Sequence, residues 1–400
     1  MANRNGGFIG TDGPDAPDPP TAVTPTAGNA QVSVAFTAPT DAGTSAITGF
    51  VAQVSTDGTN YSAGSNTGSS SPIVVSSLTN DTAATARVWA INAYGTSAPS
   101  DASVSFTPAA PIYGLYMGGV GSSNRAEIDL FDFASLGNAS DYGDLTTQHG
   151  YGTGMGSATR AIIAGGTSES STQIDVIEYM TFATTGTPAD FGNLTAATRY
   201  AASVGSSTRG IIGGGKTAAT TGTNVMEYIT IANTGNATDF GDLSIGGSEF
   251  EGGCQSTTRG VFCGGDRGND KVMDYITMAS TGNATDFGDM NVERKSHSSD
   301  SNSVRGLMVA GRGSSVINSI DYITIASTGN ASDFGDVEAA KKHMTAICNS
   351  TTLLACGGES NTNDCGKTTI ASTGNTAYFG ALTSQKNGGA GASNGHGGIA

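Results

Sequence analysis

Histidines and cysteines are the residues of this sequence whose spacing would best reveal a catalytic or metal site. The four histidines, His149, His297, His343 and His396, occupy different offsets within the repeats described below. Zinc ligands are typically spaced as in Cys-x-x-Cys, and the chain has no such pair. It also has no Ser-His-Asp context and no glycine-rich phosphate loop leading into a helix. We therefore expect no metal, no cofactor and no enzymatic activity.

The five cysteines leave two interpretations open. Cys254 and Cys263 are nine residues apart, and Cys348 and Cys356 are eight apart, at equivalent places of two repeats. If each pair flanks a hairpin turn, a cross-strand disulfide is geometrically conceivable. We expect small buried hydrophobic side chains instead, because Cys365 takes the place of an isoleucine in the preceding repeat.

A repeated acidic phrase is the other candidate for chemistry. Residues 279–289 read ASTGNATDFGD, and variants of this phrase stand at 134–144, 183–193, 232–242, 326–336 and 371–381. The repeated aspartates could form a binding array, or the phrase could be scaffold. We expect scaffold, in which Thr-Gly-Asn reverses the chain because Gly and Asn tolerate positive φ. The aromatic residue would pack inside, and the aspartate before it would bind nearby backbone amides. The Asn-x-Ser/Thr triplets are then turn residues rather than glycosylation sites.

The composition argues against two classes of partner. The chain has 34 acidic residues, 18 basic residues and a net charge of −16. Such a surface repels phosphate backbones, so we expect no nucleic-acid partner. We also expect no membrane insertion, because no run of about 18 apolar residues occurs. The N-terminus lacks the apolar segment of a secretory signal.

Residues 18–109 have the pattern of short, alternating strands. Turn sequences such as TDGTN separate the strand-like stretches at 31–36, 47–55, 71–78, 84–93 and 103–107. Strands this short and regular predict an all-β sandwich. Residues 1–17 are rich in Gly, Asn and Asp and end in prolines, and we expect them to form a docking arm.

This region resembles a fibronectin type III domain. Phe36 and Pro39 match the end of that family's B strand, where Trp is usual, and Ala84 stands where the family has its corner tyrosine. The order of residues around the F strand matches the family at Leu78, Thr82, Ala90, Asn92, Gly95, Ser97, Pro99 and Ser100. The resemblance implies a spacer or a support for binding.

Residues 110–400 consist of six repeats. Each has an apolar strand ending in double glycine (Ala-Gly in the fifth repeat), a variable loop, a second strand, the acidic phrase leading into a third strand, and a fourth strand. Four strands in a period near 50 residues predict the blade of a β-propeller. Aligned on the aromatic residue of the phrase, the repeats are spaced by 49, 49, 47, 47 and 45 residues, at Tyr142, Phe191, Phe240, Phe287, Phe334 and Phe379.

The repeats resemble kelch-type propellers, whose strands are named a to d. That family has a double glycine after strand b, a tryptophan entering strand d and an arginine before strand a. Here Phe or Tyr fills the tryptophan position, and Arg199 stands at the arginine position of one repeat. The resemblance implies six blades. Because the first repeat begins at strand b and the last continues through 387–400, we expect the C-terminal strand to complete the first blade.

Variation between the repeats predicts where a partner binds. Length differences are confined to the b–c loops, and the d–a turns vary most in chemistry. These two kinds of loop share one face, because the strands run alternately up and down. Function concentrates where the repeats of a scaffold differ. The predicted partner-binding residues on this face are Lys216, Glu249, Phe250, Glu251, Arg267, Arg294, Lys295, Lys341, Lys342 and His343.

The combination of modules points to a viral protein. A fibronectin-like module beside a Gly/Ser/Thr-rich propeller is typical of extracellular proteins, and proteins of particles released by lysis need no signal peptide. Residues 322–336, YITIASTGNASDFGD, are similar to repeats in structural proteins of marine tailed phages, especially cyanophages. This implies a tail, fibre or head-decoration appendage exposed on the virion and oligomeric there. We expect residues 1–17 to bind other virion proteins and the propeller to contact a host-surface glycan or protein.

Two other classes of function stay open. One is a non-viral bacterial adhesin or carbohydrate-binding protein, which genomic neighbours would distinguish from a phage protein. The other is a propeller enzyme, such as a glycan hydrolase or a copper oxidase. Metal analysis and a glycan-cleavage screen would detect it.

Overall fold

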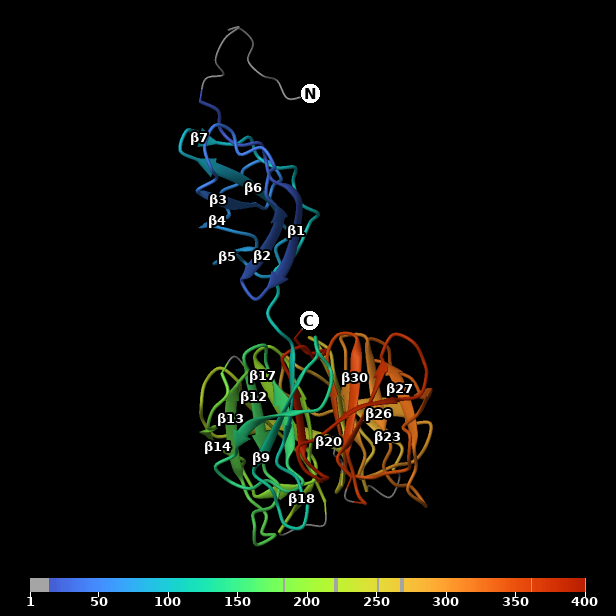
Figure 1. Ribbon diagram of the computed structural model, residues 1–400. Helices are drawn as coiled ribbons and strands as arrows, with labels where there is room; N and C mark the ends of the chain where they lie inside the picture. Colours follow the sequence, from blue (N-terminus) through green and yellow to red (C-terminus); the bar gives the residue numbers. More distant parts are fainter. Residues whose placement is uncertain are drawn as a thin grey trace. The chain divides into compact units, whose positions relative to one another are not determined.

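The computed structural model describes residues 14–182, 184–218, 222–249, 252–266, 270–360 and 362–399 (Figure 1). Every helix or strand assigned in this part of the chain is a β-strand, which confirms the predicted all-β class. The chain divides into two compact units between Pro111 and Ile112, two residues after the expected boundary. Most of the expected docking arm, residues 1–13, lies outside the described residues.

The first unit is built from two antiparallel sheets, with strand orders β1-β2-β5 and β4-β3-β6-β7. Alternate residues of β2 and β6 are buried, as expected for strands with one face on a core. Inward side chains such as Val32, Phe50 and Val88 form a single hydrophobic cluster. The strands are β1 (Thr21–Gly28), β2 (Gln31–Thr37), β3 (Gly49–Ser55), β4 (Gly64–Gly68), β5 (Ile73–Ser76), β6 (Thr85–Asn92) and β7 (Gly95–Thr96).

Residues 97–106 run beside β6 without forming the strand predicted over 103–107. The amides of Ser97, Ser100 and Ser103 donate to carbonyls of alternate β6 residues. Each serine hydroxyl also accepts the amide of the residue that its own amide contacts. Three residues of the segment therefore match two of β6, which is incompatible with the two-residue period of a strand.

Residues 14–17, expected in the arm, are held against this sandwich. The Asn92 carboxamide nitrogen donates to the carbonyls of Asp15 at 2.9 Å and Ala42 at 2.8 Å. The Asp15 amide donates to Thr44 Oγ1. The arm expected over 1–17 is thus shortened at its C-terminal end.

In its described residues, the second unit contains six four-stranded antiparallel sheets. Each sheet has an innermost strand a, a buried strand b, a strand c that is partly buried, and an outer strand d. Strand a of sheet 1 is the last strand of the chain. The sheets are sheet 1, β33 (Ala390–Ser393), β8 (Tyr113–Met117), β9 (Glu127–Asp132) and β10 (Ser140–Asp144); sheet 2, β11 (Thr153–Gly156), β12 (Arg160–Ala164), β13 (Val176–Thr181) and β14 (Ala189–Asn193); sheet 3, β16 (Ala202–Gly205), β17 (Arg209–Gly213), β19 (Thr223–Thr230) and β20 (Thr238–Gly247); sheet 4, β21 (Gly253–Gln255), β22 (Arg259–Cys263), β23 (Val272–Thr277) and β24 (Thr285–Asp289); sheet 5, β25 (Ser298–Ser301), β26 (Arg305–Val309), β27 (Ser319–Thr324) and β28 (Ser332–Asp336); sheet 6, β29 (Met344–Cys348), β30 (Thr352–Gly357), β31 (Asp364–Thr369) and β32 (Ala377–Ala381).

The innermost strands contact one another in a cyclic order. This order is β33, β11, β16, β21, β25 and β29, and β29 contacts β33 again. Strand b of each sheet is apolar and almost fully buried, for example RAIIA in β12 and RGVFC in β22. Such strands are covered on both faces, which explains their continuous apolar runs.

The acidic phrase forms the junctions between sheets. Between sheets 3 and 4, the Gly282 amide donates to the Phe240 carbonyl at 2.7 Å, and Asn283 Oδ1 accepts the Asp242 amide at 3.0 Å. The chain reversal itself comes earlier, where the Ser280 amide donates to the Thr277 carbonyl. The prediction that Thr-Gly-Asn makes the reversal is therefore wrong. Asparagines of the phrase accept a neighbouring sheet's amide at five junctions, through Asn138, Asn236, Asn283, Asn330 and Asn375.

The aromatic residue of the phrase is the extra residue of a β-bulge. In β24, Asp286 and Gly288 pair with consecutive residues of β23, so Phe287 has no partner in the ladder and its ring is buried. The glycine after it adopts a φ of 135°. A Cβ on Gly288 would lie 2.5 Å from the Gly329 carbonyl of the next sheet, so the glycine that follows the aromatic residue is required for this close approach.

The cysteines pack as small hydrophobic side chains. All five are free and buried, which confirms the packing interpretation. Cys254 and Cys263 belong to one hydrophobic cluster, and Cys356 lies opposite Cys365 in adjacent strands of sheet 6.

Candidate functional site

The b–c and d–a connections lie together at one end of the six sheets, which we call the loop end. In sheet 3 they pair as two short antiparallel strands, β15 (Thr198–Arg199) and β18 (Lys216–Thr217). Elsewhere the same contact is a single antiparallel bridge, as between Ser248 and Asp266 or between Lys295 and Arg312. Connections that vary in sequence are thus brought side by side.

Two predicted lysines form ion pairs shorter than 3 Å at the loop end. Lys295 Nζ lies 2.8 Å from Asp266 Oδ2, and this hydrogen bond raises the pKa of Lys295. Lys342 Nζ lies 2.9 Å from Glu359 Oε1, and the same carboxylate oxygen is 3.8 Å from His343 Nε2. The acid partners are about half exposed, whereas the lysine side chains are mostly buried, so the carboxylates are the more accessible half of each pair.

The other predicted residues are dispersed over the loop end. Lys216 is half-buried in β18, and Lys341 Nζ donates to Thr362 Oγ1 at 2.8 Å. Phe250, Glu251 and Arg267 lie outside the described residues. Partner binding by these residues stays a prediction.

Arg294 is not a surface residue, so the prediction is wrong for it. Its side chain is fully buried, and Nη2 lies 2.9 Å from Asp321 Oδ2. Nη1 donates to the carbonyls of Met308, Ala310 and Ser319. Burial lowers the pKa of Arg294 and raises that of Asp321. The d–a turn folds this side chain inward, where it neutralises a buried carboxylate.

The partner of Arg294 belongs to a set of buried carboxylates that sequence reasoning missed. Lys386 Nζ lies 3.0 Å from Asp129, and His149 Nε2 lies 3.7 Å from Glu178. Other members accept amides of d–a turns instead, as Glu227 does from Thr195. The signal was an acid at one position of five apolar c strands, namely Asp129, Glu178, Glu227, Asp274 and Asp321.

Six residues just before the innermost strands form what we call the left-handed ring. All adopt φ between 52° and 58°. Backbone amides of ring members donate to carbonyls of neighbouring members, as Tyr200 does to Tyr151 at 3.0 Å and His343 to Ser296 at 2.8 Å. The spacings of 49, 49, 47, 47 and 45 residues equal those of the phrase aromatics. The members are Tyr151, Tyr200, Glu249, Ser296, His343 and Gly388.

The side chains of the ring separate into an aromatic arc and a polar arc. The Tyr151 ring centroid lies 4.6 Å from that of Tyr200 and 5.0 Å from that of His343. On the polar arc, Ser296 Oγ donates to Glu249 Oε2 at 2.9 Å. Glu249 and His343 were predicted here. Tyr151, Tyr200 and Ser296 were missed, although their spacing could have identified them.

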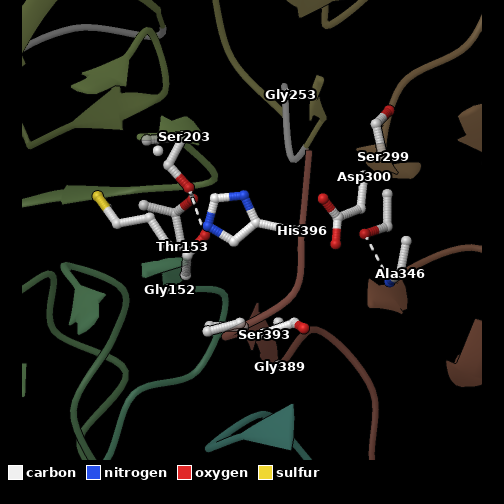
Figure 2. A pocket seen from close by; sticks show the side chains of 18 of the residues that line it. Gly152, Thr153, Ser203, Gly253, Ser299, Asp300, Ala346, Gly389, Ser393 and His396 are labelled. Carbon is white, nitrogen blue, oxygen red and sulfur yellow. Dashed lines mark hydrogen bonds between the residues drawn. The ribbon is translucent and has the colours of Figure 1, made fainter. Parts of the chain in front are cut away.

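A narrow cavity of about 50 Å³ lies among the innermost strands, with Tyr151 and Gly388 of the ring in its lining. This volume suits a few water molecules. Figure 2 shows the His396 imidazole between Thr153 and Ser203 on one side and the Asp300 carboxylate on the other. His396 Nε2 is 2.8 Å from the Gly156 carbonyl, and Nδ1 accepts the Gly398 amide at 3.1 Å. The imidazole therefore anchors residues 396–398 among the sheets.

Two titratable groups in this cavity have strongly shifted pKa values. Burial raises the pKa of Asp300 to about 7, despite hydrogen bonds from the Ser301 and Cys348 amides and Gln255. Burial lowers the pKa of His396 to about 4, so its imidazole is neutral at neutral pH. In the described residues, no group of three or more His, Cys, Asp or Glu side chains could hold a metal ion. That part of the chain also contains no helix long and apolar enough to cross a membrane.

Comparisons with known proteins give little guidance. No family model matches the chain, and no curated protein matches it. Among solved structures, a crystal structure of titin domains A168–A170 is similar at 26% identity with a TM-score of 0.23. The match covers 24% of this chain and 33% of the titin chain, so the chain spans about a third of that structure's length.

Proposed function

We propose that residues 112–399 form a six-bladed, kelch-like β-propeller and that residues 14–111 form a fibronectin III-like sandwich. The cyclic order of the innermost strands supports the propeller. So does the position of β33, which pairs with β8 in sheet 1. The Asn138–Ala381 bond between sheets 6 and 1 repeats the other junctions. Joining the first and last segments of the unit in this way covers the edge of β8 that β9 does not pair with.

The proposed role is that of a non-catalytic binding scaffold, an exposed appendage of a tailed-phage particle that contacts a host-surface glycan or protein. The observation that carries this proposal is the contrast between the two ends of the sheets. Junction residues repeat almost letter for letter, whereas the loop end differs in every sheet. A rigid frame that presents variable side chains is typical of recognition proteins. The virion assignment depends on the resemblance of the repeats to phage structural proteins.

Binding to host cells tests the loop end. We expect labelled protein to bind the cells and binding to fall when both ion pairs are removed at constant net charge, with Lys295→Ser, Asp266→Ser, Lys342→Ser and Glu359→Ser. A control that also keeps the net charge constant, Lys367→Ser with Asp286→Ser, changes residues outside the connections of the loop end and should bind as wild type. If both variants bind the cells as well as wild type does, the contact surface does not include these ion pairs.

Mass spectrometry and cryo-EM of purified particles test the virion assignment. The protein should be present in stoichiometric amounts and visible on the particle surface, and deletion of residues 1–17 should prevent incorporation. Absence from particles would contradict the virion role and leave host-cell binding to be judged separately.

A further inference from the structure

The left-handed ring carries side chains at positions where glycine would be the least strained residue. Five of its six members are not glycine, although a left-handed φ is costly for residues with a Cβ. The double glycines show that this chain does use glycine at such angles, for example at Gly214 and Gly215. Strained residues that keep their side chains are characteristic of ligand-binding sites.

The chemistry of the ring is asymmetric. The rings of Tyr151, Tyr200 and His343 contact one another, with the Tyr200 and His343 rings stacked at 29° and 6.0 Å, and the two tyrosines are partly exposed whereas His343 is buried. Gly388 lies between His343 and Tyr151 in the ring, and a Cβ there would lie 2.4 Å from the Tyr151 ring. On the other side Glu249 supplies a partly exposed carboxylate, which the buried Ser296 hydroxyl holds in place by a hydrogen bond.

We propose that the left-handed ring binds a pyranose unit of a glycan. This inference rests on the proposed recognition function and assigns its ligand class and position. The C–H face of a pyranose packs on the exposed part of the tyrosine rings, as apolar surfaces pack on aromatic faces. Sugar hydroxyls donate to the Glu249 carboxylate, in bonds stronger than those between neutral groups. The ligand lies over the ring, because the cavity beneath it holds only about 50 Å³.

An organic cation is the competing ligand, since aromatic faces beside a carboxylate also attract quaternary ammonium groups. The ring favours the sugar because the Tyr151 and Tyr200 centroids are only 4.6 Å apart. Rings in mutual contact leave no space for a cation between them, and the Arg199 guanidinium of the chain itself already lies over the Tyr200 ring, 5.0 Å from its centroid.

Saturation-transfer NMR on the full chain tests this inference. The probes are methyl glycosides of glucose, galactose, mannose and N-acetylglucosamine, with tetramethylammonium as the cationic probe. We expect saturation transfer to at least one glycoside and a loss of affinity of about tenfold or more in Glu249→Gly and Tyr200→Asn. Gly and Asn tolerate the left-handed conformation, so both variants should remain folded. The matched control is Ser171→Gly, which relieves a left-handed residue (φ 57°) in a b–c loop and should bind as wild type.

The outcomes separate this inference from the proposed function. Wild-type affinity in both folded ring variants would overturn it, as would a response to tetramethylammonium alone. A chain that binds host cells but no glycoside would also overturn it, while the recognition function would stand. Failure to bind cells as well would contradict both.

Discussion

At the residue scale, the buried carboxylates of the c strands differ in what faces them. Glu178 is close to His149 and accepts the Thr146 hydroxyl and amide. Burial acts to raise its pKa, but these interactions outweigh burial and lower it. Glu227 occupies the same position one sheet later, where burial dominates over its bond to Thr195 and raises the pKa. An ionised glutamate at this position therefore stabilises the folded state in sheet 2 and destabilises it in sheet 3.

This contrast predicts opposite pH dependences for two variants. Glu227 has a raised folded-state pKa, so wild-type stability falls as pH rises above the ordinary value of 4.5. Glu227→Gln should raise the melting temperature at neutral pH, and the gain should vanish at pH values below 4.5.

Glu178 has a lowered folded-state pKa, so its contribution to stability is present above 4.5 and lost as pH falls through the folded value. Glu178→Gln should lower the melting temperature at neutral pH. Melts across this pH range check both, and equal shifts of the same sign would contradict the assignment.

Arg294 provides a second prediction at this scale. Arg294→Met leaves Asp321 buried without its cation, which should destabilise the unit by about 3–5 kcal/mol in a denaturant titration. Adding Asp321→Asn should restore a large part of that loss. Lys342→Ala removes a partly exposed ion pair and should cost less than Arg294→Met, on the order of 1 kcal/mol. A small effect of Arg294→Met would show that its guanidinium is not the main compensation for Asp321.

At the element scale, the acidic phrase is a junction between sheets. The repeated Phe and Gly encode a bulge, and the repeated Gly-Asn binds the preceding sheet. The sequence predicts the scaffold role, because repetition is visible in one chain. The junction geometry was not predictable from it, since each half of the phrase bonds to a copy about 40 residues away. Exposed aspartates such as Asp286 belong to this frame.

A pair of glycine substitutions tests the junction. Gly288→Ala places a methyl group 2.5 Å from the Gly329 carbonyl at a φ of 135°, so we expect a loss of about 1–3 kcal/mol or more. Gly186→Ala is the control within another copy of the phrase, because its added Cβ would meet nothing within 4 Å. Denaturant midpoints measure both. Equal tolerance of the two changes would contradict the close approach of the sheets.

At the scale of the whole molecule, the sequence predicts the all-β class because alternation and turn signals are local. The alternating direction of the strands also predicts that the b–c and d–a connections lie at the same end of the sheets. It does not reveal which loop side chains turn inward, since Arg294 and Lys295 are adjacent in sequence but lie in the interior and at the surface. Nor does it draw attention to Tyr151 and Tyr200, whose significance arises only when residues 49 apart meet in a ring.

The contacts of β33 predict how the second unit fails when its last strand is lost. β33 pairs with β8 and contacts both neighbouring innermost strands, β11 and β29, so its removal exposes three elements at once. Deleting residues 387–400 should therefore abolish cooperative unfolding of residues 112–386.

Trp89 is the single tryptophan and lies in β6 of the first unit, so its fluorescence reports that unit alone. In the truncated chain the Trp89 transition should keep its wild-type midpoint, while the tyrosine circular dichroism of the second unit loses its transition. A second unit that still melts cooperatively at the wild-type temperature would show that β33 is dispensable. It would contradict the proposal that the C-terminal strand closes the circle of six sheets.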